Sequence, residues 1–227
     1  MRKLLLTTAA VAAAICLAGC SKTPTPESVP ETHNTFTDSR DGQKYRTVVI
    51  GGDRWMAQNL NYEIPDSSWC YKNKESYCRK YGRLYTWNAA MTACPNGYHL
   101  PSIAEWDSLT QAARGKMTII SLRNMIVGSI GAGKTLKAKT GWKWNGLWNK
   151  NAGTDNYGFS ARPGGGRLND GNFDAIGRGG IWWTATENGI YSGHYRNMNY
   201  LSDDVAQYAY GESKNNGFSV RCVADSS

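Results

Sequence analysis

Four cysteines beyond residue 20 are the side chains with the widest range of chemistry in this sequence. Thiols pair as disulfides, bind metals or act as nucleophiles. The spacing of Cys70, Cys78 and Cys94 fits no zinc template, and the three histidines are far apart in the sequence, so we expect no metal site. Four cysteines allow three pairings. We favour the short-range pair Cys70–Cys78 together with Cys94–Cys222, which would tie the middle of the chain to its last strand; free catalytic thiols are the alternative.

Three tryptophans offer flat aromatic faces within nine residues of one another: Trp142, Trp144 and Trp148. In an extended chain, Trp142 and Trp144 share a face. Indole rings can stack on sugar rings while neighbouring Asn and Lys side chains bond hydroxyl groups. The pattern makes these tryptophans candidate ligand-binding residues; the alternative is that they fill gaps in a loop-rich core.

Residues 128–135 match the phosphate-loop pattern G-x-x-x-x-G-K-T at every position. In a nucleotide-binding fold, the amides of this loop cradle phosphates, which requires a buried strand before it and a helix after it. Residues 126–127 are too short to be a convincing strand, and a Gly-Trp pair at 141–142 follows within two turns. We therefore expect no nucleotide binding despite the match.

Several carboxylate and amide side chains could offer oxygens to calcium, which takes six to eight such ligands. Their spacing lacks the pattern of the helix-loop-helix calcium loop, so polar turns are the preferred interpretation. We expect no cofactor, with calcium as the alternative. His99 could act as a general base, but no triad is visible around it, and a structural hydrogen bond is preferred. The oxygen-bearing residues are Asp155, Asn169, Asp170, Asn172 and Asp174.

The first 20 residues carry the pattern of an export signal. Two basic residues precede an apolar run at 4–17, which is too short to span a bilayer, since that needs about 20 residues. The string Leu-Ala-Gly-Cys that ends at Cys20 resembles the lipobox of bacterial lipoproteins, whose cysteine receives a diacylglyceryl group and becomes the new N-terminus. We expect a signal peptide at 1–19 and a lipid anchor on Cys20; an ordinary cleavage nearby is the alternative.

The sequence after Cys20 predicts how the chain is organised. Residues 20–36 are rich in Pro, Thr, Ser and Glu, which predicts a disordered tether. A single globular domain is expected at 37–227. Because Ser21 is not acidic, the lipoprotein resemblance implies an outer-membrane anchor, with the domain facing the periplasm or the cell surface. Export also favours two disulfides.

The formal net charge of +8 is spread along the chain without a dense basic run. Nucleic-acid binding usually needs a basic patch or stripe, and export makes it still less expected. Acidic polysaccharide or an anionic envelope surface would suit the charge better, and a solvated surface is the alternative.

The elements that must position these residues divide between helices in the first half and strands in the second. Strand alternation around Gly51-Gly52 predicts a hairpin over 45–60. Helices are predicted over 84–93, from the capping box at Ser102 onward, and over 117–127. An α+β domain is therefore expected. The strands predicted in the second half are 180–186, 194–200, 205–210 and 217–223.

Several strings in this order closely resemble the Fibrobacter succinogenes major paralogous domain family, over residues 38–224. Members of that family look like secreted or lipid-anchored surface proteins without an established activity. The strings are Tyr-Gly-Arg-Leu-Tyr-Thr-Trp at 81–87, Cys-Pro-Asn-Gly-Tyr-His-Leu-Pro-Ser at 94–102, Asn-Tyr-Gly-Phe-Ser-Ala at 156–161, Trp-Trp-Thr-Ala-Thr-Glu at 182–187 and Gly-Phe-Ser-Val-Arg-Cys-Val at 217–223.

A more distant similarity links Leu-Pro-Ser-x-x-Glu-Trp and Gly-Phe-Ser-Val-Arg-Cys to the formylglycine-generating branch of C-type-lectin-like folds. It implies a single domain with two or three helices, a twisted and mostly antiparallel sheet and long Gly/Trp-rich loops. It also implies a bond between a cysteine near the first helix and one in the final strand, which Cys94 and Cys222 match. The oxidase chemistry of that branch is not carried over, because it needs a free pair of cysteines.

We expect the chain to be a lipid-anchored binding or adhesion module of the cell surface or envelope, not an enzyme. Its partners would be the membrane, through the anchor, and a polysaccharide or a surface protein. The alternatives are a distant formylglycine-generating-type oxidase and a structural envelope protein without a small ligand.

Overall fold

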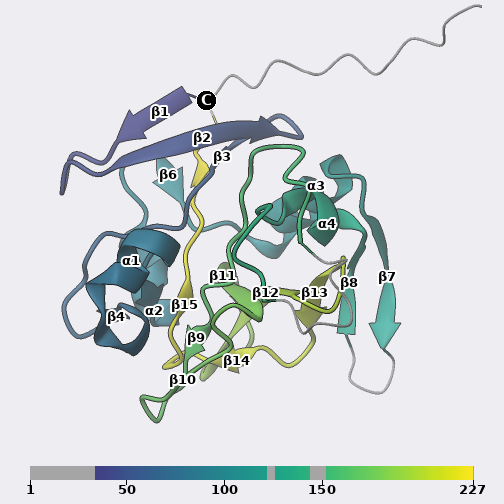
Figure 1. The fold of residues 1–227 in the computed structure, drawn as a ribbon. Coiled ribbons are helices and arrows are strands. Elements are labelled where there is room, and N and C mark those ends of the chain that lie inside the picture. The colour runs from purple at the N-terminus through teal and green to yellow at the C-terminus, as the bar shows by residue number, and fades with distance from the viewer. Residues whose placement is uncertain (1–33, 122–125, 144–151, 227) are drawn as a thin grey trace, which may run out of the picture. The chain divides into compact units, whose positions relative to one another are not determined.

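The hairpin predicted around Gly51-Gly52 is present in the structure, a computed structural model that describes residues 34–121, 126–143 and 152–226 (Figure 1). It lies in an antiparallel sheet of five strands, in the order β1-β2-β3-β16-β6. Val48 pairs with Trp55 across the turn, and Val223 of the last strand pairs with the other side of Trp55. The strands are β1 (Asn34–Thr37), β2 (Lys44–Ile50), β3 (Asp53–Met56), β6 (Tyr98–His99) and β16 (Val223–Ala224).

A larger sheet runs in the order β4-β5-β15-β11-β12-β13-β8-β7, with β14 added beside β12. Its pairs are antiparallel except β11 with β15. The strands β9 (Gly166–Arg167) and β10 (Phe173–Asp174) form a separate small ribbon. The strands of the large sheet are β4 (Ser68–Trp69), β5 (Leu84–Tyr85), β7 (Lys116–Ser121), β8 (Ile126–Ile130), β11 (Gly179–Glu187), β12 (Ser192–Asn199), β13 (Val205–Tyr208), β14 (Glu212–Ser213) and β15 (Phe218–Ser219).

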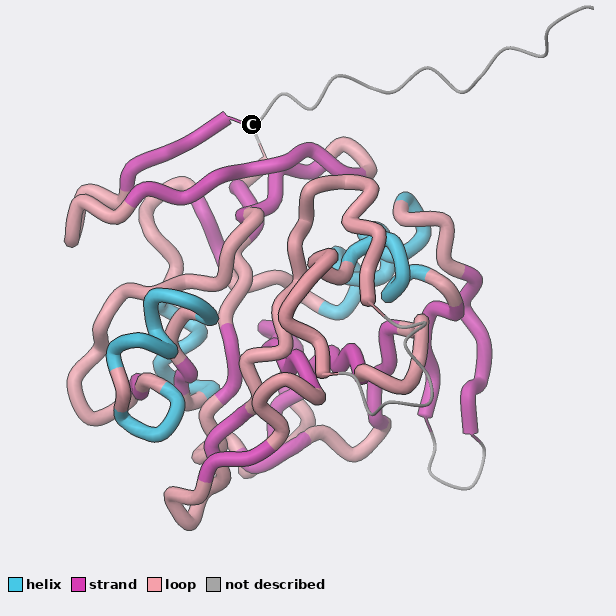
Figure 2. The backbone as a smooth tube through the Cα atoms, in the orientation of Figure 1, coloured by secondary structure: helices cyan, strands magenta, loops and turns pink. Residues whose placement is uncertain are grey.

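Short helices, cyan in Figure 2, connect the strands of the first half, whereas in the described part of the second half α4 is the one helix among strands and loops. The predicted capping box is present at the start of α3, because the Ser102 hydroxyl accepts from the Glu105 amide and the Glu105 carboxylate accepts from the Ser102 amide. The described residues therefore form an α+β fold in which antiparallel pairing dominates. The helices are η1 (Tyr71–Asn73), α1 (Glu75–Tyr81), α2 (Trp87–Ala93), α3 (Ile103–Ala112) and α4 (Ala132–Leu136).

Adjacent tryptophans on β11 divide the core into two clusters. Successive strand residues point to opposite faces of a sheet. Trp182 packs with Trp106 of α3, with ring centroids 6.0 Å apart, whereas Trp183 packs with Phe218 and Tyr195 on the other face. Both tryptophans are fully buried. Helix α3 thus covers one face of the large sheet, and the opposite face holds the second cluster and a groove described below.

The helix predicted over 117–127 is wrong. The chain forms β7 and β8 there, and β8 pairs with β13 as well as with β7. Met117 and Ile119 are exposed on the edge strand rather than packed as a helical face. The segment is rich in Ile, Val and Thr, which favour a strand once a partner strand is available, and that pairing overrides the helical spacing.

Two further boundaries differ from the sequence-based expectation. Residues 34–36 were assigned to the tether, but β1 pairs with β2 from Asn34 onward, so these residues belong to the sheet. Helix α1 was not predicted, because only Cys78 and Tyr81 of its side chains are buried and its apolar periodicity is therefore weak. The region before Asn34, including Cys20, lies outside the described residues.

Both favoured disulfides are present. Cys70 joins Cys78 at the two ends of the segment that contains η1 and the start of α1, and Cys94 joins Cys222. The second bond links the end of α2 to the residue before β16, which are 128 residues apart in sequence. It thereby ties the helical half to the C-terminal strands.

Among the described residues, no helix has both the length and the apolar character that crossing a membrane requires.

Candidate functional site

Of the three candidate tryptophans, the structure describes Trp142, while Trp144 and Trp148 lie outside the described residues. Trp142 is half-buried against the core, and its indole nitrogen donates to the Ala161 carbonyl at 3.3 Å. The ammonium of buried Lys137 lies 4.8 Å from the ring centroid. Burial lowers the pKa of Lys137 to about 8. Trp142 therefore covers a buried cation, and a role in ligand binding stays a prediction for all three tryptophans.

The phosphate-loop match is divided between the end of β8, a turn and α4. Two of its amides form hydrogen bonds within the protein. Gly131 N–H donates to the Asp204 carboxylate at 3.2 Å, and Lys134 N–H donates to the Asp203 carbonyl at 3.0 Å. The Lys134 ammonium bonds the Ala152 carbonyl. The loop therefore packs against the turn that contains Asp203 and Asp204, and these two amides do not face an open phosphate-binding cradle.

The oxygens considered for calcium serve turns and surface pairs. Asp155 accepts from the amide and hydroxyl of Ser160 at 2.7 and 2.6 Å. Asp170 accepts from Asn172, and Asp174 accepts from Arg178. In the described part of the chain, the one group of three potential metal ligands is Cys70, Glu75 and Cys78, whose two sulfurs are already bonded to each other.

His99 takes a structural position between two carboxylates. Its Nδ1 lies 2.7 Å from Asp225 Oδ1, and its Nε2 lies 2.6 Å from Glu105 Oε1. Burial acts to lower the pKa of His99, but the hydrogen bonds to Asp225 and Glu105 raise it above its usual value. His99 thus joins the capped start of α3 to the C-terminal residues.

The open face of the large sheet carries a groove that none of these predictions included. Two hollows, of about 350 and 260 Å³, share Asn197 and Tyr208 and together form what we call the tyrosine groove. It runs over β12 and β13, between β10, β14 and β15 on one side and β8 on the other. Its lining side chains include Asp174, Tyr195, Asn197, Tyr208, Glu212, Asn216 and Phe218.

Strand alternation explains why these side chains face the groove. On β12, Arg196 and Met198 point into the core under α3, where the Arg196 guanidinium donates to Asp107 at 2.6 Å. The residues that alternate with them, Tyr195 and Asn197, therefore point to the opposite face. The Arg196–Asp107 ion pair and buried Met198 fix β12 on its core face, and this also fixes which of its side chains face the groove.

Two stacked tyrosines form the wall of the groove. The rings of Tyr195 and Tyr208 lie 5.6 Å apart at an interplanar angle of 16°, and Phe218 packs against Tyr195 at 5.5 Å. Burial, together with the charge of Glu212, raises the pKa of Tyr195, so its phenol stays protonated at neutral pH. Tyr208 is only half-buried, which leaves part of the aromatic surface open to a ligand.

Unused hydrogen-bonding groups lie beside these rings. Within the described residues, no protein group bonds the Asn197 side-chain amide or the hydroxyls of Tyr195 and Tyr208. The two carboxylates of the groove are partly used, because Glu212 accepts from Asn216 at 3.2 Å and the well-exposed Asp174 pairs with Arg178. The groove thus combines an aromatic wall with free donors and acceptors, a combination typical of small-ligand sites.

Sequence reasoning missed this site although a signal was present. In residues 195–199, one aromatic and two amide side chains alternate with Arg196 and Met198, which are buried in the core. Alternation of this kind predicts a strand with one functional face. The acidic residues of the groove, Asp174 and Glu212, come from β10 and β14. The positions of these strands depend on strand pairing that the sequence does not show.

A buried polar network also escaped prediction. The fully buried Arg221 guanidinium donates to Asn59 Oδ1 at 3.0 and 2.7 Å and to the carbonyls of Met56 and Phe159. Trp182 Nε1 donates to the same Asn59 oxygen at 2.9 Å. The arginine within the segment predicted as a strand at 217–223 was the available signal, because a buried charge needs polar partners.

Comparison with known proteins identifies the family. Residues 48–224 match the Fibrobacter succinogenes major domain, and the chain belongs to that family. The match runs from β2 to the last strand, so it includes the hairpin, both disulfides and the tyrosine groove. The chain matches no curated protein and no solved structure.

Proposed function

We propose that this protein is an exported binding module that holds a saccharide in the tyrosine groove. The observation that carries the proposal is the pair of stacked tyrosines, Tyr195 and Tyr208, with the unbonded Asn197 amide beside them. A sugar ring has an apolar face that suits an aromatic wall and hydroxyls at its edge that suit amides and carboxylates. The groove supplies both kinds of contact.

The dimensions of the groove favour a short stretch of saccharide. Ligand pockets commonly enclose about 300–1,000 Å³, and the larger hollow alone has about 350 Å³. The second hollow continues past Tyr208 toward Leu201 and Asp204, so a chain of several sugar units could extend along β13. An elongated groove suits a polysaccharide better than a compact cofactor.

The alternative of a formylglycine-generating-type oxidase has less support. That chemistry needs a reactive pair of cysteines, whereas Cys70, Cys78, Cys94 and Cys222 are bonded in two disulfides. For the fold, we propose the C-type-lectin-like class. The support is the bond from the end of α2 to the residue before β16, which follows the arrangement implied by the sequence resemblance.

Replacing Tyr208 with alanine is expected to weaken saccharide binding at least about tenfold, because it removes the open part of the aromatic wall. The purified full chain would be titrated with cello-, xylo- and galacturono-oligosaccharides by calorimetry. Tyr191→Ala is the matched control, since Tyr191 is 81% exposed and does not line the groove. Equal affinity of the Tyr208→Ala and wild-type proteins for every saccharide that binds would contradict the proposal, as would the absence of any binding.

We also propose that lipid on Cys20 anchors the chain at the outer membrane, supported by the Leu-Ala-Gly-Cys string and the Pro/Thr-rich segment after it. Growth with labelled palmitate should label the wild-type protein and leave Cys20→Ser unlabelled. Label retained by Cys20→Ser would refute the anchor and leave the groove proposal untouched.

A further inference from the structure

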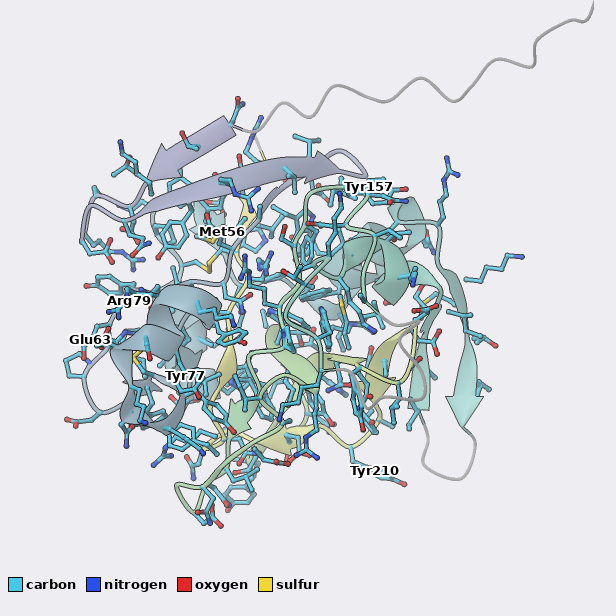
Figure 3. All side chains as sticks on the ribbon, viewed as in Figure 1. Met56, Glu63, Tyr77, Arg79, Tyr157 and Tyr210 are labelled. Atoms are coloured by element: carbon cyan, nitrogen blue, oxygen red, sulfur yellow. A yellow bond between two sulfur atoms is a disulfide. The ribbon has the colours of Figure 1, made fainter. Side chains whose placement is uncertain are left out.

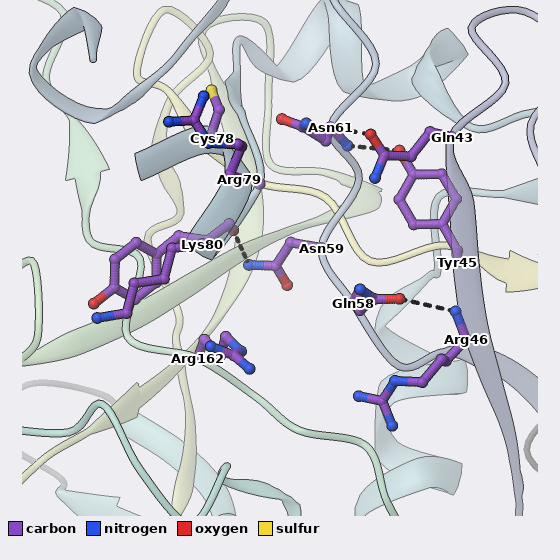
Figure 4. Close-up of a pocket in the computed structure, with 12 residues that line it drawn as sticks. Gln43, Tyr45, Arg46, Gln58, Asn59, Asn61, Cys78, Arg79, Lys80 and Arg162 are labelled. Atoms are coloured by element: carbon purple, nitrogen blue, oxygen red, sulfur yellow. Dashed lines mark hydrogen bonds between the residues drawn. The ribbon is translucent and has the colours of Figure 1, made fainter. Parts of the chain in front are cut away.

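A second cavity lies away from the tyrosine groove and shares no lining residue with it. It has a volume of about 120 Å³ and sits between β2, the segment after β3 and the end of α1 (Figure 4). In Figure 3, Arg79 on α1 is well separated from Tyr210, which follows β13. We call this cavity the basic pocket, because its charged lining residues are Arg46, Arg79, Lys80 and Arg162.

Positive charge in the basic pocket is not neutralised by the protein. No Asp or Glu lines it, and among the described residues none of its four cations forms an ion pair. The nearby Arg83 shows the contrast, because it binds Glu63 at 2.8 Å and Glu75 at 3.5 Å. Cations that line one cavity without counter-charges create a positive potential that attracts anions.

The floor of the pocket strengthens this field. Asn59 lines the cavity, and its oxygen is held by the buried guanidinium of Arg221. Arg221 has no carboxylate among its hydrogen-bond partners. Burial lowers the pKa of Arg221 to about 9; the charge of Asp155 opposes this shift, and the charges of Arg162 and Arg46 act in the same direction as burial. A fifth cation therefore lies behind the four that line the pocket.

Amide side chains complete the lining and leave donors for a ligand. Gln58 uses its oxygen to accept from the Arg46 amide at 2.8 Å, as the dashed line in Figure 4 shows, and its nitrogen makes no bond within the described residues. Arg46 and Arg162 are half-buried, whereas Arg79 and Lys80 are exposed at the rim. Half-buried guanidinium groups beside amide donors suit an oxyanion.

The volume of the basic pocket limits its ligand to a single carboxylate, sulfate or phosphate group. A cavity needs about 10–15 Å³ to hold one water molecule, and 120 Å³ is several times that. A carboxylate, sulfate or phosphate group fits with a few waters, whereas a polymer chain does not. We propose that the basic pocket binds a single oxyanion group, carried by an acidic saccharide or present as a free inorganic anion.

The test uses the purified full chain at low ionic strength, titrated with inorganic sulfate, inorganic phosphate and trigalacturonate, with galactotriose as the neutral probe. Arg46→Gln/Arg162→Gln should weaken anion binding at least about tenfold while leaving neutral saccharide binding unchanged. Lys116→Gln/Lys139→Gln, which removes the same charge from exposed positions outside the pocket, is the matched control. Circular dichroism would verify that both variants fold.

The outcomes separate the sources of the anion. Binding of trigalacturonate alone would identify an acidic saccharide, and binding of sulfate or phosphate would identify a free oxyanion. If no anion binds, or if both double variants lose the same amount of affinity, the basic pocket is not an anion site. Because Tyr208→Ala leaves the basic pocket intact, failure here is distinguishable from failure of the tyrosine groove.

Discussion

Asn59→Ala is expected to destabilise the folded domain by about 3–5 kcal/mol, a large share of the roughly 5–15 kcal/mol that holds a domain together. The substitution removes the oxygen that accepts two hydrogen bonds from Arg221 and one from Trp182. Hydrogen bonds to a charged group contribute about 1.5–3 kcal/mol, and a buried donor left without a partner adds its desolvation cost. The bond from Asn59 to the Tyr81 carbonyl is lost as well.

Urea unfolding followed by tryptophan fluorescence would measure this loss. Asn61→Ala is the matched control, because Asn61 is two residues away and its side chain makes a single weak bond of 3.5 Å to Gln43. We expect Asn61→Ala to stay within about 1 kcal/mol of the wild type. If the two variants unfold at similar urea concentrations, the Arg221 network does not hold the core as described.

Removal of the Cys94–Cys222 disulfide is expected to cost about 4–5 kcal/mol, against about 2–3 kcal/mol for Cys70–Cys78. The difference follows from chain entropy, because the first bond closes a loop of 128 residues and the second closes one of 8. Cys222 is also fully buried in the second core cluster, so its environment tolerates little rearrangement.

The paired variants Cys94→Ala/Cys222→Ala and Cys70→Ala/Cys78→Ala would be compared by urea unfolding under oxidising conditions. Alanine is used because a buried serine hydroxyl would add an unrelated penalty. The variant without Cys94–Cys222 should unfold at a clearly lower urea concentration than the variant without Cys70–Cys78. The opposite order of stability would contradict the entropic explanation of these crosslinks.

Local sequence signals predicted much of the fold. The Gly51-Gly52 turn, the capping box at Ser102 and the strand predicted at 180–186 each involve residues within a few positions of one another. Such features are set by backbone geometry and hydrogen bonds that form locally. The distribution of predicted helices and strands gave the expectation of an α+β fold, which the structure confirms.

The remaining features depend on contacts between distant parts of the chain. Residues 117–127 have helical spacing, but β8 finds partners on both sides, so strand pairing prevails. Arg221 and Asn59 are 162 residues apart in sequence, and no local pattern links them. The tyrosine groove likewise joins β10, β12, β13 and β15, and only the alternation within β12 was visible beforehand.

Locating a bound saccharide on the protein by NMR is the most direct test of the proposal that the tyrosine groove binds it. Nitrogen-labelled full-length protein would be titrated with the tightest-binding oligosaccharide while side-chain amide and indole resonances are followed by NMR. We predict that the Asn197 and Asn216 side-chain amides shift, because both line the groove, while the Trp142 indole does not. Shifts at the Trp142 indole, with Asn197 and Asn216 unchanged, would contradict the account and place the ligand at the tryptophan-rich segment instead.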